Sequence, residues 1–303
     1  MGYLHIENLY KPSAQKVLEF KKVFAMEKIH GTSAHVRWRK VDPDKPGEVT
    51  FFSGGAKYEQ FAQIFNIKDL AEKFEARGIN NVTVYGEAYG GNMQSMSLVY
   101  GPTLKFIAFD VYLKHEEAEH PFWLSVPKAE AFTLQLGLEF VSYVECSSDL
   151  EVLDAQRDAF SVQALRNGMG EHPREGIVIR PPYEVLLNNG ERVIAKHKTT
   201  AYQERKRQPK VGEKPEVLAE AETIAEEWVT ENRLAHVIDH LKGEGVNVND
   251  LASTSRVIKA MKEDIIREAN GEVILSDEAF KVIGRKTALM FKKNVVNALY
   301  VAY

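Results

Sequence analysis

The sequence predicts an α+β protein of two domains, a mixed domain of strands and helices over residues 1–208 and a helical domain over 209–303. Short β-prone runs bounded by glycine and proline fill the first two thirds of the chain. Residues 205–215 are charged and broken by prolines, as is typical of a linker. Beyond them strand signals almost vanish and apolar residues recur at spacings of three and four. These three observations indicate a sheet domain joined to a small all-helical C-terminal domain.

Each expected element follows from its own local pattern. Apolar alternation and turn residues predict strands over 23–26, 34–41, 49–52, 82–85, 106–112, 140–144, 176–180 and 192–198. Helical spacing, with glycine at several ends, predicts helices over 58–77, 125–136, 150–166, 217–232, 234–242, 251–269 and 277–300. Most of these strands lie next to the charged residues discussed below.

Composition bounds the class of protein. The chain of 303 residues has a formal net charge of −4, which argues against a general nucleic-acid coat protein but allows a local basic groove. Its one cysteine, Cys146, excludes an internal disulfide framework and a cysteine-rich zinc site. The N-terminus lacks the pattern of a signal peptide, and no apolar run reaches the length of a membrane span. We therefore expect a cytoplasmic protein, a monomer, with no membrane partner.

A lysine stands between the two first expected strands. In Glu27-Lys28-Ile29-His30-Gly31, the lysine ends an apolar run and Gly31 follows where the chain must turn tightly. A lysine amine can act as a nucleophile when its surroundings favour the neutral form. Taken alone, the same pattern also describes a surface lysine in a turn.

Four more stretches place charged or aromatic residues at the end of an expected strand or within one. They are Tyr85-Gly86-Glu87, Phe109-Asp110, Glu175-Gly176 leading to Arg180, and Lys196-His197-Lys198. Because residues i and i+2 of a strand share a face, Lys196 and Lys198 point one way and His197 points the other. That lysine pair indicates either a solvent-exposed strand face or a clamp for a polyphosphate. Glu87 and Glu175 are either surface carboxylates or ligands for a ribose hydroxyl and a divalent metal, and Phe109 is either a core residue or a stacking platform.

The five stretches, in this order across residues 24–200, resemble the motifs of the covalent nucleotidyltransferase superfamily of ATP-dependent ligases and capping enzymes. His30 followed by Gly31-Thr32 is most similar to the double-strand RNA ligases, the second class of phage RNA ligases and the RNA-editing ligases. The resemblance implies an ATP-grasp-like nucleotidyltransferase domain of mixed, largely antiparallel sheets, followed by a helical C-terminal domain.

The resemblance also implies a role for each residue. Lys28 would attack the α-phosphorus of ATP and carry AMP, Glu27 and Ile29 would line the adenine pocket, Phe109 would stack on adenine and Glu87 would bind the ribose. Glu175 would act with Mg²⁺ or Mn²⁺, directly or through water, while Lys196 and Lys198 hold the phosphates. The implied function is an ATP-dependent RNA ligase that seals 3′-hydroxyl and 5′-phosphate ends of RNA through lysyl-AMP. A DNA ligase, a capping-type enzyme and a non-catalytic RNA-binding protein stay open as alternatives.

Two positions depart from the family pattern. Ser33 stands where relatives usually carry an asparagine, and we expect it to bind the nucleotide in that place. Relatives also carry an arginine after the next strand, but Ser53-Gly54-Gly55 offers none, so Lys57 is the nearest cation. We expect His30 and Lys57 to contact RNA phosphates.

The last expected helix carries a basic stripe. At about 100° per residue, Lys281, Arg285 and Lys292 fall on one face, while Val282, Leu289, Val296 and Leu299 could turn to the core. The stripe indicates either a solvated helix face or an RNA-binding clamp in the helical domain.

Overall fold

The structure is a computed structural model, and it describes residues 2–114, 122–206, 209–212 and 217–301, with side chains as far as residue 297. The chain divides into two compact units, Met1–Thr199 and Thr200–Tyr303. The expected boundary residue 208, part of the expected linker and the side chain of Leu299 lie outside the described residues. Among the described residues, none of the helices combines the length and apolar character that crossing a bilayer requires.

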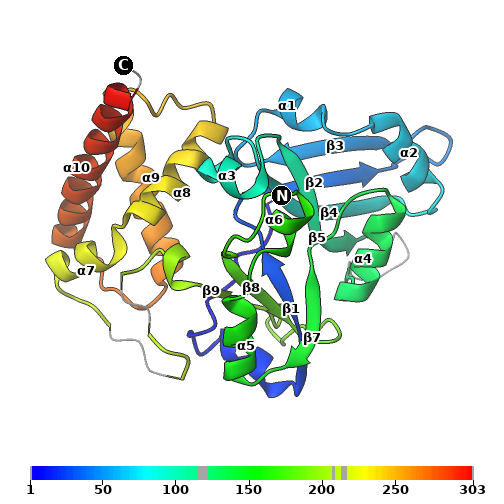
Figure 1. The fold of residues 1–303 in the computed structure, drawn as a ribbon, viewed down its shortest axis with the longest axis horizontal. Coiled ribbons are helices and arrows are strands. Elements are labelled where there is room, and N and C mark those ends of the chain that lie inside the picture. Colours follow the sequence, from blue (N-terminus) through cyan, green and yellow to red (C-terminus); the bar gives the residue numbers. More distant parts are fainter. Residues whose placement is uncertain (1, 115–121, 207–208, 213–216, 302–303) are drawn as a thin grey trace. The chain divides into compact units, whose positions relative to one another are not determined.

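Two antiparallel sheets form the first unit (Figure 1). One sheet has the strand order β7-β1-β8-β9, and the other has the order β3-β2-β4-β5-β6. The strands are β1 (Lys22–Lys28), β2 (Thr32–Arg39), β3 (Glu48–Ser53), β4 (Asn81–Tyr89), β5 (Lys105–Leu113), β6 (Phe122–Trp123), β7 (Tyr143–Ser147), β8 (Gly176–Arg180) and β9 (Ala195–Lys198). Three residues, Ile29, His30 and Gly31, link β1 of one sheet to β2 of the other, so this turn connects the two sheets.

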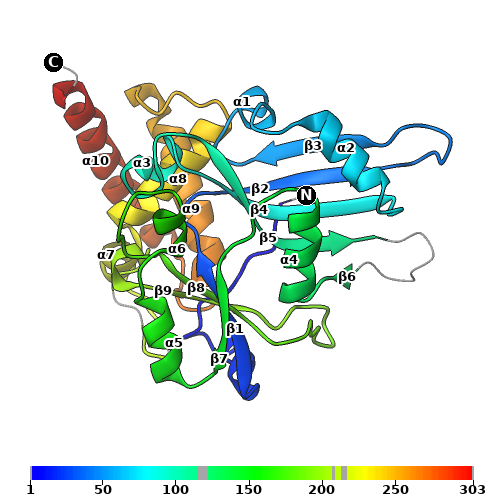
Figure 2. The same cartoon turned by 45° about the vertical axis from the view of Figure 1, so that its right-hand side comes forward.

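Helices cover one face of the five-stranded sheet. The helices of this unit are α1 (Tyr58–Ala62), α2 (Ile67–Glu75), α3 (Ser97–Tyr100), α4 (Val126–Gln135), α5 (Leu150–Arg157) and α6 (Val162–Arg166). Phe61, Phe74 and Phe132 of α1, α2 and α4 pack with Val36 and Val84 of the sheet in the main apolar core. Figure 2 shows α2 and α4 beside β2, β3 and β4. The opposite face of the sheet carries the more polar residues.

The second unit is helical, as the sequence predicts. Its helices are α7 (Ala221–Trp228), α8 (Glu231–Gly243), α9 (Thr254–Ala269) and α10 (Asp277–Val301). Their apolar stripes meet in a separate core around Trp228, Leu234, Met261, Ile283 and Phe291. Arg205, which we expected to begin a linker, is buried against this core, where it pairs with Glu272 and lies over the Trp228 ring.

Several expected elements have different bounds. The helix expected over 58–77 is two helices, because the Asn66 side chain accepts a hydrogen bond from the Asp69 amide and starts α2. The helix expected over 150–166 is interrupted in the same way by Ser161, which caps α6. The strand expected over 192–198 forms only from Ala195, and the one expected over 140–144 begins at Tyr143.

Candidate active site

Lys28 is the last residue of β1, and the chain turns immediately after it into β2. Gly31 makes this turn possible because a Cβ at that position would lie 2.4 Å from the carbonyl oxygen of Ala88 on β4. The turn therefore approaches the end of β4 closely. This approach brings the lysine of one sheet toward Glu87 of the other.

Glu175 lies at the centre of a group of basic side chains, Lys28, His30 and Lys198, which we call the lysine cluster. Its Oε2 atom is 3.0 Å from Nζ of Lys28 and 3.2 Å from Nδ1 of His30, and its Oε1 atom is 3.0 Å from Nζ of Lys198. Burial raises the pKa of this carboxyl, but Lys28, Lys198 and His30 together hold it well below its usual range. Glu175 is therefore an ionised, buried carboxylate that aligns two lysines.

Sheet register explains why these residues meet. Lys28 lies opposite Gly176 on β8, and Gly176 lies opposite Lys198 on β9. Gly176 has a φ of 153°, and a Cβ there would lie 2.2 Å from the carbonyl oxygen of His197. Only glycine lets β8 and β9 approach this closely, so Glu175 at the start of β8 reaches both lysines.

The lysine pair of β9 is buried. Lys196 and Lys198 are 9% and 8% exposed, so β9 does not present the solvent-exposed strand face that was the alternative. His197 points to the other side, where its Nε2 atom is 2.7 Å from Oδ1 of Asp154. The outer edge of β9 is covered, since Leu9 N donates to the Lys196 carbonyl. Buried ammonium groups on one face favour a bound anion.

Glu87 projects from β4 at the position opposite Ser33. Its Oε2 atom is buried and has no hydrogen-bond partner among the described residues. Burial raises its pKa to about 8, which Lys28 partly offsets and Glu175 reinforces. An unpartnered buried carboxyl is costly unless a ligand supplies the missing hydrogen bond. Glu87 therefore suits a hydroxyl-bearing ligand.

Phe109 and Asp110 are adjacent in sequence but have different surroundings. Phe109 is partly exposed, and the Tyr3 ring contacts it edge-on at 4.8 Å between centroids. Asp110 is fully buried and pairs with Arg180 at 3.0 Å and with Arg192 at 2.7 Å. Arg180, the last residue of β8, therefore pairs with Asp110 of the other sheet and does not join the lysine cluster.

A family model described as RNA ligase matches residues 21–198, which is more than half of the chain. The chain belongs to the RNA ligase family. Sequence comparison with curated proteins gave no match.

Solved structures that match part of the chain include RNA ligases of Naegleria gruberi. A mutant with AMP and manganese is 17% identical with a TM-score of 0.49, and a mutant with ATP and manganese is 16% identical with a TM-score of 0.49. The same ligase with pyrophosphate is 17% identical with a TM-score of 0.48. Each comparison covers 67% of this chain and 57% of the other chain.

In this member of the RNA ligase family, three of the residues assigned to the nucleotide have side-chain surroundings of their own. Glu27 is buried and accepts hydrogen bonds from the Ser161 hydroxyl and from the amides of Val162 and Gln163 at the start of α6. Ile29 is 2% exposed and belongs to the apolar core, while Ser33 is exposed. The contacts of these residues with a nucleotide stay predictions.

The residues assigned to RNA differ in their surroundings. His30 contacts Glu175 directly, and Lys57 is exposed at the start of α1. On α10, Lys281, Arg285 and Lys292 are all exposed, as expected for one face. Leu289 and Val296 are 66% and 42% exposed, so the expectation that they turn to the core is wrong. They lie at spacings of four and three from the cations and therefore share the outer face.

The sequence reasoning missed the partners that fix these side chains. Tyr3 donates a hydrogen bond from its hydroxyl to Asp110 at 2.7 Å, and Arg192 contacts the same carboxylate. The sequence carries no signal for these contacts, because Tyr3 and Arg192 lie at opposite ends of the first unit's sequence. Only the sheet topology brings them together.

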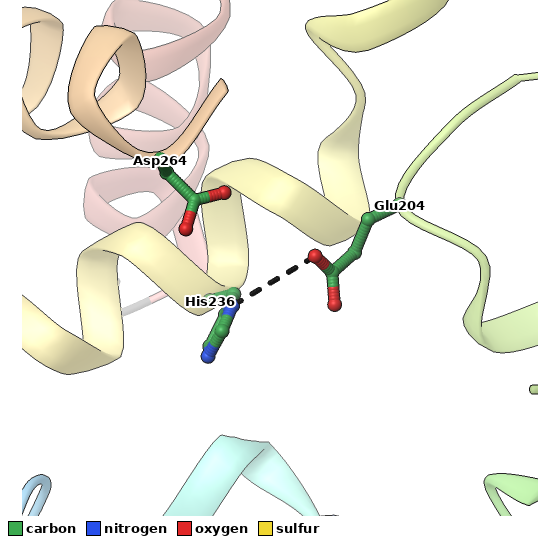
Figure 3. Close-up of side chains that lie close together, drawn as sticks. All are labelled: Glu204, His236 and Asp264. Carbon is green, nitrogen blue, oxygen red and sulfur yellow. Dashed lines mark ion pairs between the residues drawn. The ribbon is translucent and has the colours of Figure 1, made fainter. Parts of the chain in front are cut away.

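Among the described residues of the helical unit, Glu204, His236 and Asp264 form a group that resembles a metal site (Figure 3). Their ligand atoms lie within 4.8 Å of one another. However, the buried guanidinium of Arg233 bonds to Asp264 and lies 3.8 Å from Glu204, and Arg267 also pairs with Asp264. Because two arginines already neutralise these carboxylates, we interpret the group as an ion-pair network.

Proposed function

We propose that this member of the RNA ligase family is an ATP-dependent RNA ligase that joins a 3′-hydroxyl to a 5′-phosphate of RNA. The observation that carries the proposal is the alignment of Lys28 and Lys198 on the two oxygens of Glu175. The family match supports it, and the Naegleria gruberi RNA ligase structures contain ATP or AMP together with manganese.

The first step of the proposed reaction takes place at Lys28. Its amine attacks the α-phosphorus of ATP, a phosphorus–nitrogen bond forms, and the bond to pyrophosphate breaks. The amine must lose a proton to attack, and Glu175 is the carboxylate that accepts its hydrogen bond. Lys196 and Lys198 stabilise the charge on the α-phosphate and on the leaving pyrophosphate. AMP then passes to the 5′-phosphate of RNA, and the 3′-hydroxyl displaces it.

The remaining residues would position the nucleotide. Glu87 would hydrogen-bond a ribose hydroxyl through its unpartnered oxygen, and Phe109 would stack on adenine through its exposed side. These assignments also agree with the fold, because the turn at Gly31 brings the ends of β1 and β4 together.

Carboxylates of this cluster also fit a divalent metal. Hard oxygen donors suit Mg²⁺ or Mn²⁺, and Glu175 would hold the ion, directly or through water. When bound, the ion supplies positive charge that neutralises the phosphates. Both oxygens of Glu175 already accept from ammonium groups, so an incoming phosphate that draws Lys28 and Lys198 away would make the carboxylate available.

The nucleophile is tested by labelling. Incubation with ATP labelled at the α-phosphate should give an acid-labile protein–AMP adduct, and mass spectrometry should map it to Lys28. Lys28→Ala should abolish the adduct, and Lys28→Arg should abolish it too, because a guanidinium stays protonated. An adduct on any other lysine would contradict the proposal.

The alternative functions can be distinguished by the substrates that the protein uses. A capping-type enzyme would accept GTP, a DNA ligase would seal a DNA nick, and a non-catalytic RNA-binding protein would form no adduct. We expect ATP to be used in preference to GTP and nicked RNA to be sealed in preference to nicked DNA. For the helical unit, we propose a role as an RNA-binding clamp.

A further inference from the structure

The five-stranded sheet ends at β3, whose outer edge pairs with no other strand of the described chain (Figure 2). Phe52 on this edge strand is 45% exposed, so a large part of its side chain meets solvent. Its ring stacks on His35 of β2 at 5.2 Å between centroids and 21° between planes. One face of the Phe52 ring is therefore covered by His35, and the other face is open.

The side chains beneath Phe52 are aromatic. The His35 ring in turn contacts Tyr85 of β4 at 5.5 Å, and Tyr85 contacts Trp123 of β6 at 5.5 Å. Burial lowers the pKa of His35 to about 4, so this ring is neutral at physiological pH. A continuous row of rings thus holds Phe52 at the edge of the sheet.

An arginine with an unsatisfied donor lies on the same face. Arg37 follows His35 by two residues on β2, so the two side chains point to the same side. The Nε atom of Arg37 is buried and has no hydrogen-bond partner among the described residues. A buried donor without an acceptor indicates a site for an anionic or polar ligand.

This face continues from the lysine cluster. Ser33 lies opposite Glu87, and His35 lies two residues further along β2, a distance of roughly 7 Å. A strand of RNA whose end reaches the AMP held by Lys28 and Glu87 would therefore place a neighbouring nucleotide near Phe52. An open ring beside an arginine is the combination that binds an unpaired nucleotide, through stacking of the base and a contact to phosphate.

We propose that Phe52 and Arg37 form a stacking platform for an unpaired base of the RNA strand next to the reactive end. The platform rests on the proposed ligase function, and it adds a class of substrate to the nicked duplex, namely RNA with an unpaired nucleotide at the break. A base inside a duplex has both faces covered by its neighbours, so it offers no face to Phe52.

The experiment uses the full chain and single-stranded, 5′-phosphorylated RNA of about twelve nucleotides, within the usual site size. One base at a time, near either end, is replaced by fluorescent 2-aminopurine, whose emission falls when it stacks on an aromatic ring. We expect the wild type to quench the probe at one position. Phe52→Ala should remove the quenching and weaken binding by about 5- to 150-fold, the range for one lost stacking contact. Phe52→Trp should keep both.

The chain offers a matched control. Phe122 on β6 is also 45% exposed, but it lies opposite Leu113 and so on the other face of the same sheet. Phe122→Ala should bind and quench like the wild type. Arg37→Ala should weaken binding and lower the salt dependence of affinity by about one phosphate contact. The same RNA paired to its complement should show no quenching through Phe52.

Two outcomes overturn different claims. If Phe52→Ala binds and quenches like Phe122→Ala while all proteins form the AMP adduct, the platform is wrong and the ligase proposal stands. If the wild type forms no adduct but quenching still depends on Phe52, the ligase proposal is wrong and this face is an RNA-binding surface.

Discussion

The Nζ atom of Lys28 lies 3.0 Å from Oε2 of Glu175. This contact orients the amine that we propose as the nucleophile, and it depends on the charge of the carboxylate. Glu175→Gln keeps the shape of the side chain but removes that charge, so we expect the rate of adenylylation to fall by on the order of 10²-fold or more. A single-turnover assay with labelled ATP measures it. Glu145→Gln is the matched control, because Glu145 forms an exposed pair with Lys22, and a wild-type rate in Glu175→Gln would contradict the assignment.

Substitutions on the two faces of β9 should affect different properties, the rate of adenylylation on one face and the stability on the other. Lys196→Ala or Lys198→Ala should lower the rate of adenylylation by on the order of 10²-fold, because each loses a cation near the reacting phosphates. His197→Ala should lower the thermal stability more than the rate, since its ring contacts Asp154 and Arg157. Parallel rate and unfolding measurements on the three variants check this. The reverse pattern would show that the phosphates bind on the histidine side.

Local sequence signals explain how far the fold could be predicted. Alternation in 34–38 predicts β2 because one face of that strand is buried, and the spacing around Met261 predicts α9 for the same reason. The breaks inside the long expected helices were missed although Asn66 and Ser161 are good N-cap residues. An apolar spacing that continues across a cap conceals the interruption.

The sequence predicts those features of the site that depend on residues close together in the chain. Lys196 and Lys198 share a face by strand geometry alone, but their distance from Glu175 depends on the register of three strands. The surroundings of Glu27 could not be predicted, because its neighbours in sequence do not indicate that its carboxylate accepts hydrogen bonds from the start of α6. Contacts between distant segments, such as Tyr3 with Asp110, follow from topology and not from pattern.

Glu87 should make the stability depend on pH. Its ordinary pKa is 4.5, and burial raises the pKa to about 8 in the folded chain. Between these values the unfolded chain has lost the proton while the folded chain keeps it, so stability falls as the pH rises through this window. The side chain of Glu87→Gln does not titrate, so the stability of this variant should decline less as the pH rises through the same window. Unfolding by denaturant at several pH values checks the difference, and parallel curves for the two proteins would contradict the buried, neutral carboxyl.

Truncation should separate the chemistry from the sealing of RNA. A chain that ends at Thr199 keeps the first unit complete and leaves out Arg205, which pairs with Glu272 of the helical unit. We expect it to form protein–AMP at close to the wild-type rate but to seal nicked RNA poorly. Adduct formation and sealing are measured on the same preparation. Full sealing by the truncated chain would make the helical unit dispensable.

The exposed face of α10 is the part of the helical unit that we expect to bind RNA. Lys281, Arg285 and Lys292 lie on this face, and exposed Leu289 lies between them in sequence. Reversing the three charges to glutamate should leave adenylylation unchanged, because the reaction takes place in the first unit. Binding of nicked RNA should weaken, and the slope of affinity against salt should become shallower by about one for each lost phosphate contact. Arg256, Lys259 and Lys242 are exposed cations of the same unit outside α10, so their reversal is the control of equal charge. If both triple variants lower affinity and slope equally, the effect is one of net charge, and if neither does, α10 is a solvated surface and RNA binds elsewhere.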